Sequence, residues 1–148
     1  MESQLKKIFY KRFALNAFAT LVADIVIGAL AIIFWLKFSE AKSIMIIPIV
    51  FSVVLLILLI GTITTLTPYL RDWGRVRKND FQVIKGTIEG SKKEGRNSGS
   101  SATEYFPIVK AEDGTTFQIM KVDGARKGQR YSFLYLPHTK IAVILKEI

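Results

Sequence analysis

Asp24 is the residue whose type and position most directly suggest chemistry. It is the one ionisable side chain in the apolar run 13–36, and a carboxyl group in such surroundings is costly to bury and usually faces protein or water. A pathway for protons or ions through the membrane is disfavoured, because two helices alone are too few to enclose one. Two interpretations remain open. Asp24 pairs with a group on a partner helix, or it is hydrogen-bonded within its own hairpin by Asn16, Thr20 or Ser52.

Small and polar side chains accompany this aspartate. Their spacing of four residues places them on one stripe of a helix. The stripe consists of Asn16, Thr20, Asp24 and Gly28, with Ser52 at a similar depth in the second apolar run. Gly61 and Thr65 give that second run a face of small residues suited to helix packing.

The other polar residues form no recognisable catalytic or metal-binding set. Cysteine is absent, which excludes disulfides, thiol nucleophiles and Cys-based zinc sites. His138 is the single histidine and follows Pro137 with no carboxylate at motif spacing, so we interpret it as an exposed turn residue. The glycines of 90–99 lack P-loop or dinucleotide spacing. We therefore predict a non-enzymatic protein with no catalytic residue, metal or cofactor.

Two long apolar runs, 13–36 and 44–66, dominate the first half of the 148-residue chain. The second contains no charged residue. A helix rises about 1.5 Å per residue, so either run could cross a hydrocarbon layer of about 30 Å. The short connection 37–43 requires an antiparallel arrangement. The sequence predicts a transmembrane helical hairpin over 13–68, preceded by a basic segment 1–12 and followed by a junction 69–80 and a β domain 81–148.

The basic residues indicate the orientation of this hairpin. Lys and Arg exceed Asp and Glu by 21 to 12, for a formal net charge of +9, and many of the basic residues flank the apolar runs. Positive flanks stay in the cytoplasm. We therefore expect a two-span protein of the cell membrane with both termini in the cytoplasm.

The junction 69–80 begins after Pro68, which we expect to end the second helix because proline cannot continue the hydrogen-bond ladder. Its aromatic and basic residues are placed to meet lipid headgroups. They are Arg71, Trp73, Arg75, Arg77 and Lys78. One interpretation is contact with anionic lipid; the other is a plain topology signal, which the positive-inside rule already explains.

The segment 81–148 has the pattern of a small β domain. Short runs rich in β-branched and aromatic residues alternate with turn residues. The predicted strands are 82–89, 104–111, 115–121, 129–136 and 140–146. Asp113-Gly114 predicts a tight turn between the second and third strands. The expected architecture is a five-stranded curled sheet or small barrel.

A Gly- and Ser-rich loop is expected over 90–103. Lys92, Lys93 and Arg96 make it basic, so it is either a contact loop for phosphate groups or an acidic partner, or a solvated linker. Nucleic-acid binding by the aromatic residues of the β domain is disfavoured, because the same residues fit inward-facing positions of a small barrel.

Three motifs within 83–142 resemble a family of bacterial membrane proteins of unknown function. They are Tyr105-Phe106-Pro107, then Asp113-Gly114-Thr115-Thr116-Phe117, then Gly128 followed by Tyr131, Phe133, Tyr135, Pro137 and Ala142. The family couples transmembrane helices to a small β domain. After the last Tyr-x-Pro this chain has His138-Thr139-Lys140 where the family often has Asn-Pro. The resemblance implies a membrane-anchored β domain and no reaction.

Two classes of function follow from these observations. The first is a non-enzymatic accessory protein whose helices bind a larger integral membrane protein or a second copy, and whose β domain docks on the partner. An immunity protein against a membrane-targeted toxin is a special case of this class. The second is a subunit of a membrane enzyme or transporter whose active site is completed by a partner.

Overall fold

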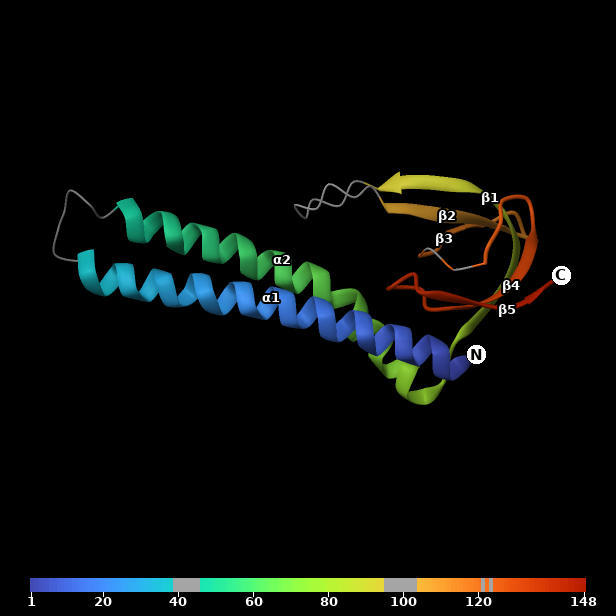
Figure 1. Cartoon of the computed structure of the whole chain (residues 1–148), viewed down its shortest axis with the longest axis horizontal. Coiled ribbons are helices and arrows are strands. Elements are labelled where there is room, and N and C mark those ends of the chain that lie inside the picture. The colour runs from blue at the N-terminus through green and yellow to red at the C-terminus, as the bar shows by residue number, and fades with distance from the viewer. Residues whose placement is uncertain (39–45, 95–103, 121, 123) are drawn as a thin grey trace. The chain divides into compact units, whose positions relative to one another are not determined.

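The computed structural model describes residues 1–38, 46–94, 104–120, 122 and 124–148 (Figure 1). The chain forms two compact units. The helical unit comprises Tyr10–Leu70, and the sheet unit combines Met1–Phe9 with Arg71–Ile148. The boundary cuts both helices, so the first turns of one helix and the last turns of the other belong to the sheet unit.

Two helices are long and apolar enough to cross a membrane. Helix α1 spans Glu2–Phe38 and helix α2 spans Ile46–Lys78. Helix α1 begins well before the predicted apolar run 13–36, and helix α2 ends well after the run 44–66. The predicted basic segment 1–12 is thus helical apart from Met1.

The prediction that α2 ends at Pro68 is wrong, because the helix continues to Lys78. A proline inside a helix removes one hydrogen bond and costs about 3 kcal/mol. The residues beyond it explain why the helix persists. Tyr69, Asp72 and Val76 are all buried, and their spacing of three and four residues brings them to one face only if the backbone stays helical.

Five strands form one antiparallel sheet in the order β3-β2-β1-β4-β5. The strands are β1 Gln82–Glu94, β2 Glu104–Ala111, β3 Thr116–Gln118, β4 Arg130–Tyr135 and β5 Ala142–Glu147. This confirms the predicted fold class. Of the two forms considered, the sheet is curled and open. Its curl lets the backbone N–H of Met120 donate to the carbonyl of Lys140 at 2.8 Å, just past β3 and just before β5.

The prediction of a loop starting at residue 90 is wrong in part, because β1 runs to Glu94 and pairs with β2 as far as Glu104. Backbone pairing with β2 is available whatever the side chains are, so it overrides the poor strand propensity of this segment. The register between β1 and β2 shifts between Ile88 and Gly90, as at a β-bulge, where one strand carries an extra residue. The predicted turn at Asp113-Gly114 is present, with Gly114 at a φ of 83°.

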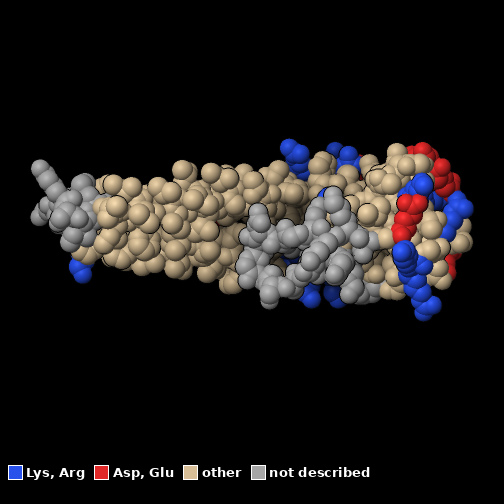
Figure 2. Space-filling model, turned by 90° about the horizontal axis from the view of Figure 1, so that it is seen from above, with Lys and Arg blue, Asp and Glu red and all other residues tan. Residues whose placement is uncertain are grey.

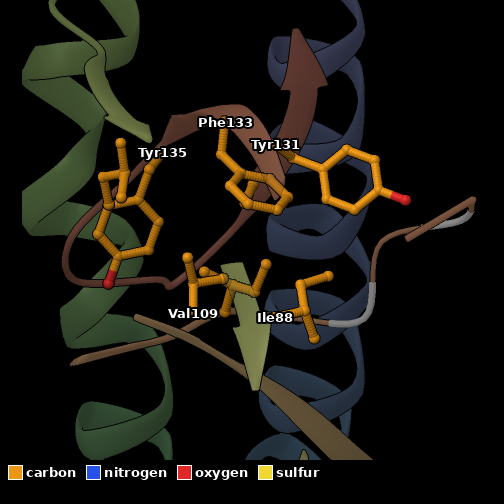
Figure 3. Close-up of a cluster of buried hydrophobic side chains, with 8 residues drawn as sticks. Ile88, Val109, Tyr131, Phe133 and Tyr135 are labelled. Carbon is orange, nitrogen blue, oxygen red and sulfur yellow. The ribbon is translucent and has the colours of Figure 1, made fainter. Parts of the chain in front are cut away.

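The concave face of the sheet holds the hydrophobic core of the sheet unit (Figure 3). Alternate residues of β4 point into it, β1, β2 and β5 contribute further residues, and Ile119 joins from just past the end of β3. The cluster consists of Ile84, Ile88, Val109, Ile119, Tyr131, Phe133, Tyr135 and Ala142. Gly86 lies inside the same curl, where a β-carbon would stand 2.4 Å from the carbonyl oxygen of Lys110. Glycine therefore permits the close approach of β1 and β2 at this point.

The opposite face of β4 is buried too. Ser132 and Leu134 alternate with the core residues and are at most 5% exposed. Leu5, Phe9 and Val76, at the helix ends within the same unit, are also fully buried. Both faces of β4 are thus buried in the sheet unit.

Candidate functional site

Asp24 makes its hydrogen bond inside the helical unit. Thr62 Oγ1 of α2 donates to Asp24 Oδ2 at 2.7 Å. The other carboxyl oxygen, Oδ1, is buried and has no hydrogen-bond partner among the described residues. The carboxyl group thus faces its own hairpin, and its partner is Thr62, which lies outside the predicted polar stripe.

Two further side-chain hydrogen bonds join α1 to α2. Asn16 Nδ2 donates to the hydroxyl of Tyr69 at 2.8 Å, and Trp35 Nε1 donates to Ser52 Oγ at 3.0 Å. Together with Asp24 they connect the helices at three depths. The hydroxyl of Thr20, by contrast, donates a hydrogen bond of 2.9 Å to the backbone carbonyl of Asn16 in the same helix.

The small residues of the two helices face different surroundings. A β-carbon at Gly28 would make ordinary contact with Leu55 at 3.9 Å, whereas one at Gly61 would meet no atom within 4 Å. Thr65 is half-buried. Gly28 therefore belongs to the contact between α1 and α2, and Gly61 faces away from it.

Among the described residues of the sheet unit, Asp72 is the most enclosed polar group. Its side chain is 0% exposed and accepts three hydrogen bonds from the turn between β4 and β5. Thr139 donates to Oδ2 from its backbone N at 2.7 Å and from its hydroxyl at 2.8 Å. His138 Nδ1 lies 2.8 Å from Oδ1. We call Asp72, His138 and Thr139 the Asp72 cluster.

The Asp72 cluster attaches the last turns of α2 to the sheet. A buried carboxylate is tolerated when several donors are aimed at it, and the turn supplies them. His138 lies in that turn and is exposed, as predicted from the sequence, but its carboxylate partner is 66 positions away. The one available signal was periodicity, because Asp72 falls on the same helical face as the apolar Tyr69 and Val76.

Tyr135 adds a titratable group beside the Asp72 cluster. Burial raises the pKa of its hydroxyl above the ordinary value of 10, and the charge of Asp72 raises it further. Both effects favour the neutral phenol. The chemistry of this region is thus that of a carboxylate held by fixed donors with a neutral tyrosine nearby.

The five headgroup residues predicted in 69–80 differ in their surroundings. Arg71, Arg77 and Lys78 are exposed. Arg75 is half-buried and lies 4.0 Å from Asp80. Trp73 is half-buried, with its ring centroid 6.1 Å from that of Phe9.

The predicted contact loop falls largely outside the described residues. Arg96 and the side chains of Lys92 and Lys93 lie outside the described residues. Within the described part of the chain, no three His, Cys, Asp or Glu side chains are grouped to hold a metal ion.

Comparison with protein families, with curated proteins and with solved structures finds no match to this chain. The resemblance to the bacterial membrane-protein family therefore stays a prediction.

Proposed function

We propose that this protein is a non-enzymatic integral membrane protein that crosses the cell membrane twice and acts as an accessory or interaction subunit. The exposed apolar surface of the helical unit carries the proposal. Leu15, Phe18 and Leu36 are 66%, 71% and 79% exposed. Water-soluble proteins rarely expose apolar patches larger than a few hundred Å², whereas a lipid environment matches such a surface.

The polar side chains of the helical unit support the same proposal. Asn16, Asp24 and Trp35 each make a hydrogen bond to the facing helix, as groups within a membrane span usually do. Figure 2 shows the distribution of charged residues on one face of the molecule. Along most of their length the helices present no Lys, Arg, Asp or Glu on the visible face.

The charges flanking the spans support a cytoplasmic location for both termini. Basic residues lie in the first turns of α1 and the last turns of α2, on Lys7, Arg71, Arg77 and Lys78 among others. The positive-inside rule assigns such flanks to the cytoplasm. Two spans return the chain to the side on which it started, so the sheet unit would also be cytoplasmic.

The Asp72 cluster favours a binding role over a catalytic one for the sheet unit. All three of its hydrogen bonds hold the helix end against the turn between β4 and β5, and the aromatic residues of β4 fill the core. These groups therefore stabilise a small domain that the membrane anchor presents to a partner. A larger membrane protein is the proposed partner.

Membrane insertion and topology are tested first. We expect the full chain to stay in the membrane fraction after carbonate extraction, and a reporter fused after Ile148 to be active in the cytoplasm. Release by carbonate, or a reporter active on the outer side, would overturn the proposal.

The partner is tested by cross-linking in native membranes. A photoreactive residue at Ile60, an exposed position of α2, should yield a product containing a second, larger membrane protein. A matched photoreactive residue at the half-buried Leu55, which faces Gly28, should yield much less of it. Products that contain this chain alone would contradict the accessory role.

A further inference from the structure

The basic residues at the end of α2 divide into two groups. Arg75 is half-buried and within ion-pair distance of Asp80. Arg71, Arg77 and Lys78 are exposed, and among the described residues no carboxylate lies within 4.0 Å of them. These three side chains, which we call the basic triad, are free to meet an external anion.

Burial of Asp72 removes the one acidic side chain that interrupts the basic triad. Its carboxylate is fully enclosed and satisfied by Thr139 and His138. It therefore does not project into the space reached by Arg71. The other acidic residue of this segment, Asp80, lies beside Arg75, so the remaining exposed charges of residues 71–78 are positive.

The basic triad begins directly after Leu70 and extends along α2 through the depth of the headgroup layer and beyond it. Leu70 is the last apolar residue before Arg71, four residues after the end of the apolar run 44–66, and α2 continues without a break to Lys78. At about 1.5 Å per residue, Arg71 lies about 1.5 Å and Lys78 about 12 Å beyond Leu70 along the axis. The headgroup layer occupies about 5–8 Å on each side of the hydrocarbon core, and the long side chains reach back toward it.

We propose that the basic triad binds the phosphate groups of anionic phospholipids in the leaflet next to the end of α2. This inference rests on the proposed membrane insertion and names a partner for it. Two guanidinium groups suit phosphate oxygens because they can donate two parallel hydrogen bonds. The ammonium group of Lys78 adds attraction at the outer edge of the layer.

The test compares lipid retention by the full chain purified in detergent containing equal amounts of phosphatidylglycerol and phosphatidylcholine. Native mass spectrometry counts the bound lipids of each kind. We expect the wild-type protein to retain phosphatidylglycerol preferentially. Replacing one member of the triad, as in Arg71→Gln, should reduce the preference about fivefold, and the triple variant Arg71→Gln/Arg77→Gln/Lys78→Gln should abolish it.

A charge-matched control separates the basic triad from net charge. Arg126, Lys127 and Lys146 are exposed residues of the sheet unit, and their triple change to glutamine removes the same charge. This control should keep the wild-type preference. An equal loss in both triple variants, or no preference in the wild type, would overturn the inference. Carbonate extraction of the same variants distinguishes failure of the lipid-binding inference from failure of the proposed function. Membrane insertion should be unchanged in all of these variants.

Discussion

The two units accommodate an aspartate in different ways, because Asp24 is half-buried and Asp72 is fully buried. In the helical unit, Asp24 accepts one hydrogen bond from Thr62 and leaves Oδ1 without a partner among the described residues. In the sheet unit, Asp72 has three hydrogen bonds to His138 and Thr139. Asp24 thus adds polarity to a contact that apolar side chains already make, whereas Asp72 joins two elements that are distant in the sequence.

This difference indicates where the protein depends on polar contacts. Two apolar helices can pair through their side-chain surfaces, and polar bonds between membrane helices contribute little on average. The end of α2 is different, because it must hold a basic, partly exposed segment against the sheet. We expect the free energy of unfolding to depend strongly on Asp72 and weakly on Asp24.

Removing the Asp72 carboxyl group is expected to have the largest effect. Asp72→Ala leaves the buried donors of Thr139 unsatisfied and should lower the free energy of unfolding of the sheet unit by about 3 kcal/mol. Urea unfolding of the full chain in detergent, followed by pulse proteolysis, measures this loss. Asp80→Ala is the matched control on an exposed neighbour and should change stability by less than about 0.5 kcal/mol. Equal effects of the two substitutions would contradict the role of the Asp72 cluster.

Gly86→Ala tests the packing of the same unit without touching a polar group. The added methyl would stand 2.4 Å from the carbonyl oxygen of Lys110, so the backbone of β1 or β2 must move. We expect a loss of about 2 kcal/mol in the same unfolding assay. Gly90→Ala, in the same strand with nothing within 4 Å of the added carbon, should cost much less.

Double-mutant cycles compare the two aspartates directly. The coupling free energy between Asp72 and Thr139, measured with single and double alanine variants, should be about 2 kcal/mol. The corresponding value for Asp24 and Thr62 should be about 0.6 kcal/mol. A coupling free energy for Asp24 and Thr62 equal to or larger than that for Asp72 and Thr139 would contradict the expected difference between the two units.

The smallest effect expected is a change of stability at high pH. The pKa of Tyr135 is raised in the folded protein, so above about pH 10 the unfolded chain loses this proton more readily than the folded one. The free energy of unfolding should therefore fall as the pH rises beyond 10, and Tyr135→Phe should reduce that slope. Asp72→Asn should reduce it less, because burial is the larger cause of the shift. An unchanged slope in Tyr135→Phe would contradict the assignment.

Much of the architecture follows from local patterns in the sequence. The apolar run 13–36 and the described part of the run 44–66 lie within the two helices, the segment 104–111 is the strand β2, and Asp113-Gly114 forms the turn that follows it. Such features depend on neighbouring residues: the length of an apolar run, the alternation of a strand, the conformational freedom of a glycine. They can therefore be predicted without knowledge of the fold.

Tertiary structure alone decided the features that join distant segments. Continuation of α2 past Pro68, the pairing of Asp72 with the turn at His138, the close approach at Gly86 and the open form of the sheet all depend on which elements meet in space. A proline normally stops a helix and a lone histidine normally lies free in a turn. Here the burial of Asp72 and Val76 keeps α2 helical beyond Pro68, and the carboxylate of Asp72 pairs with His138. Both local tendencies are overridden, because the free energy of packing is set by contacts between residues far apart in the chain.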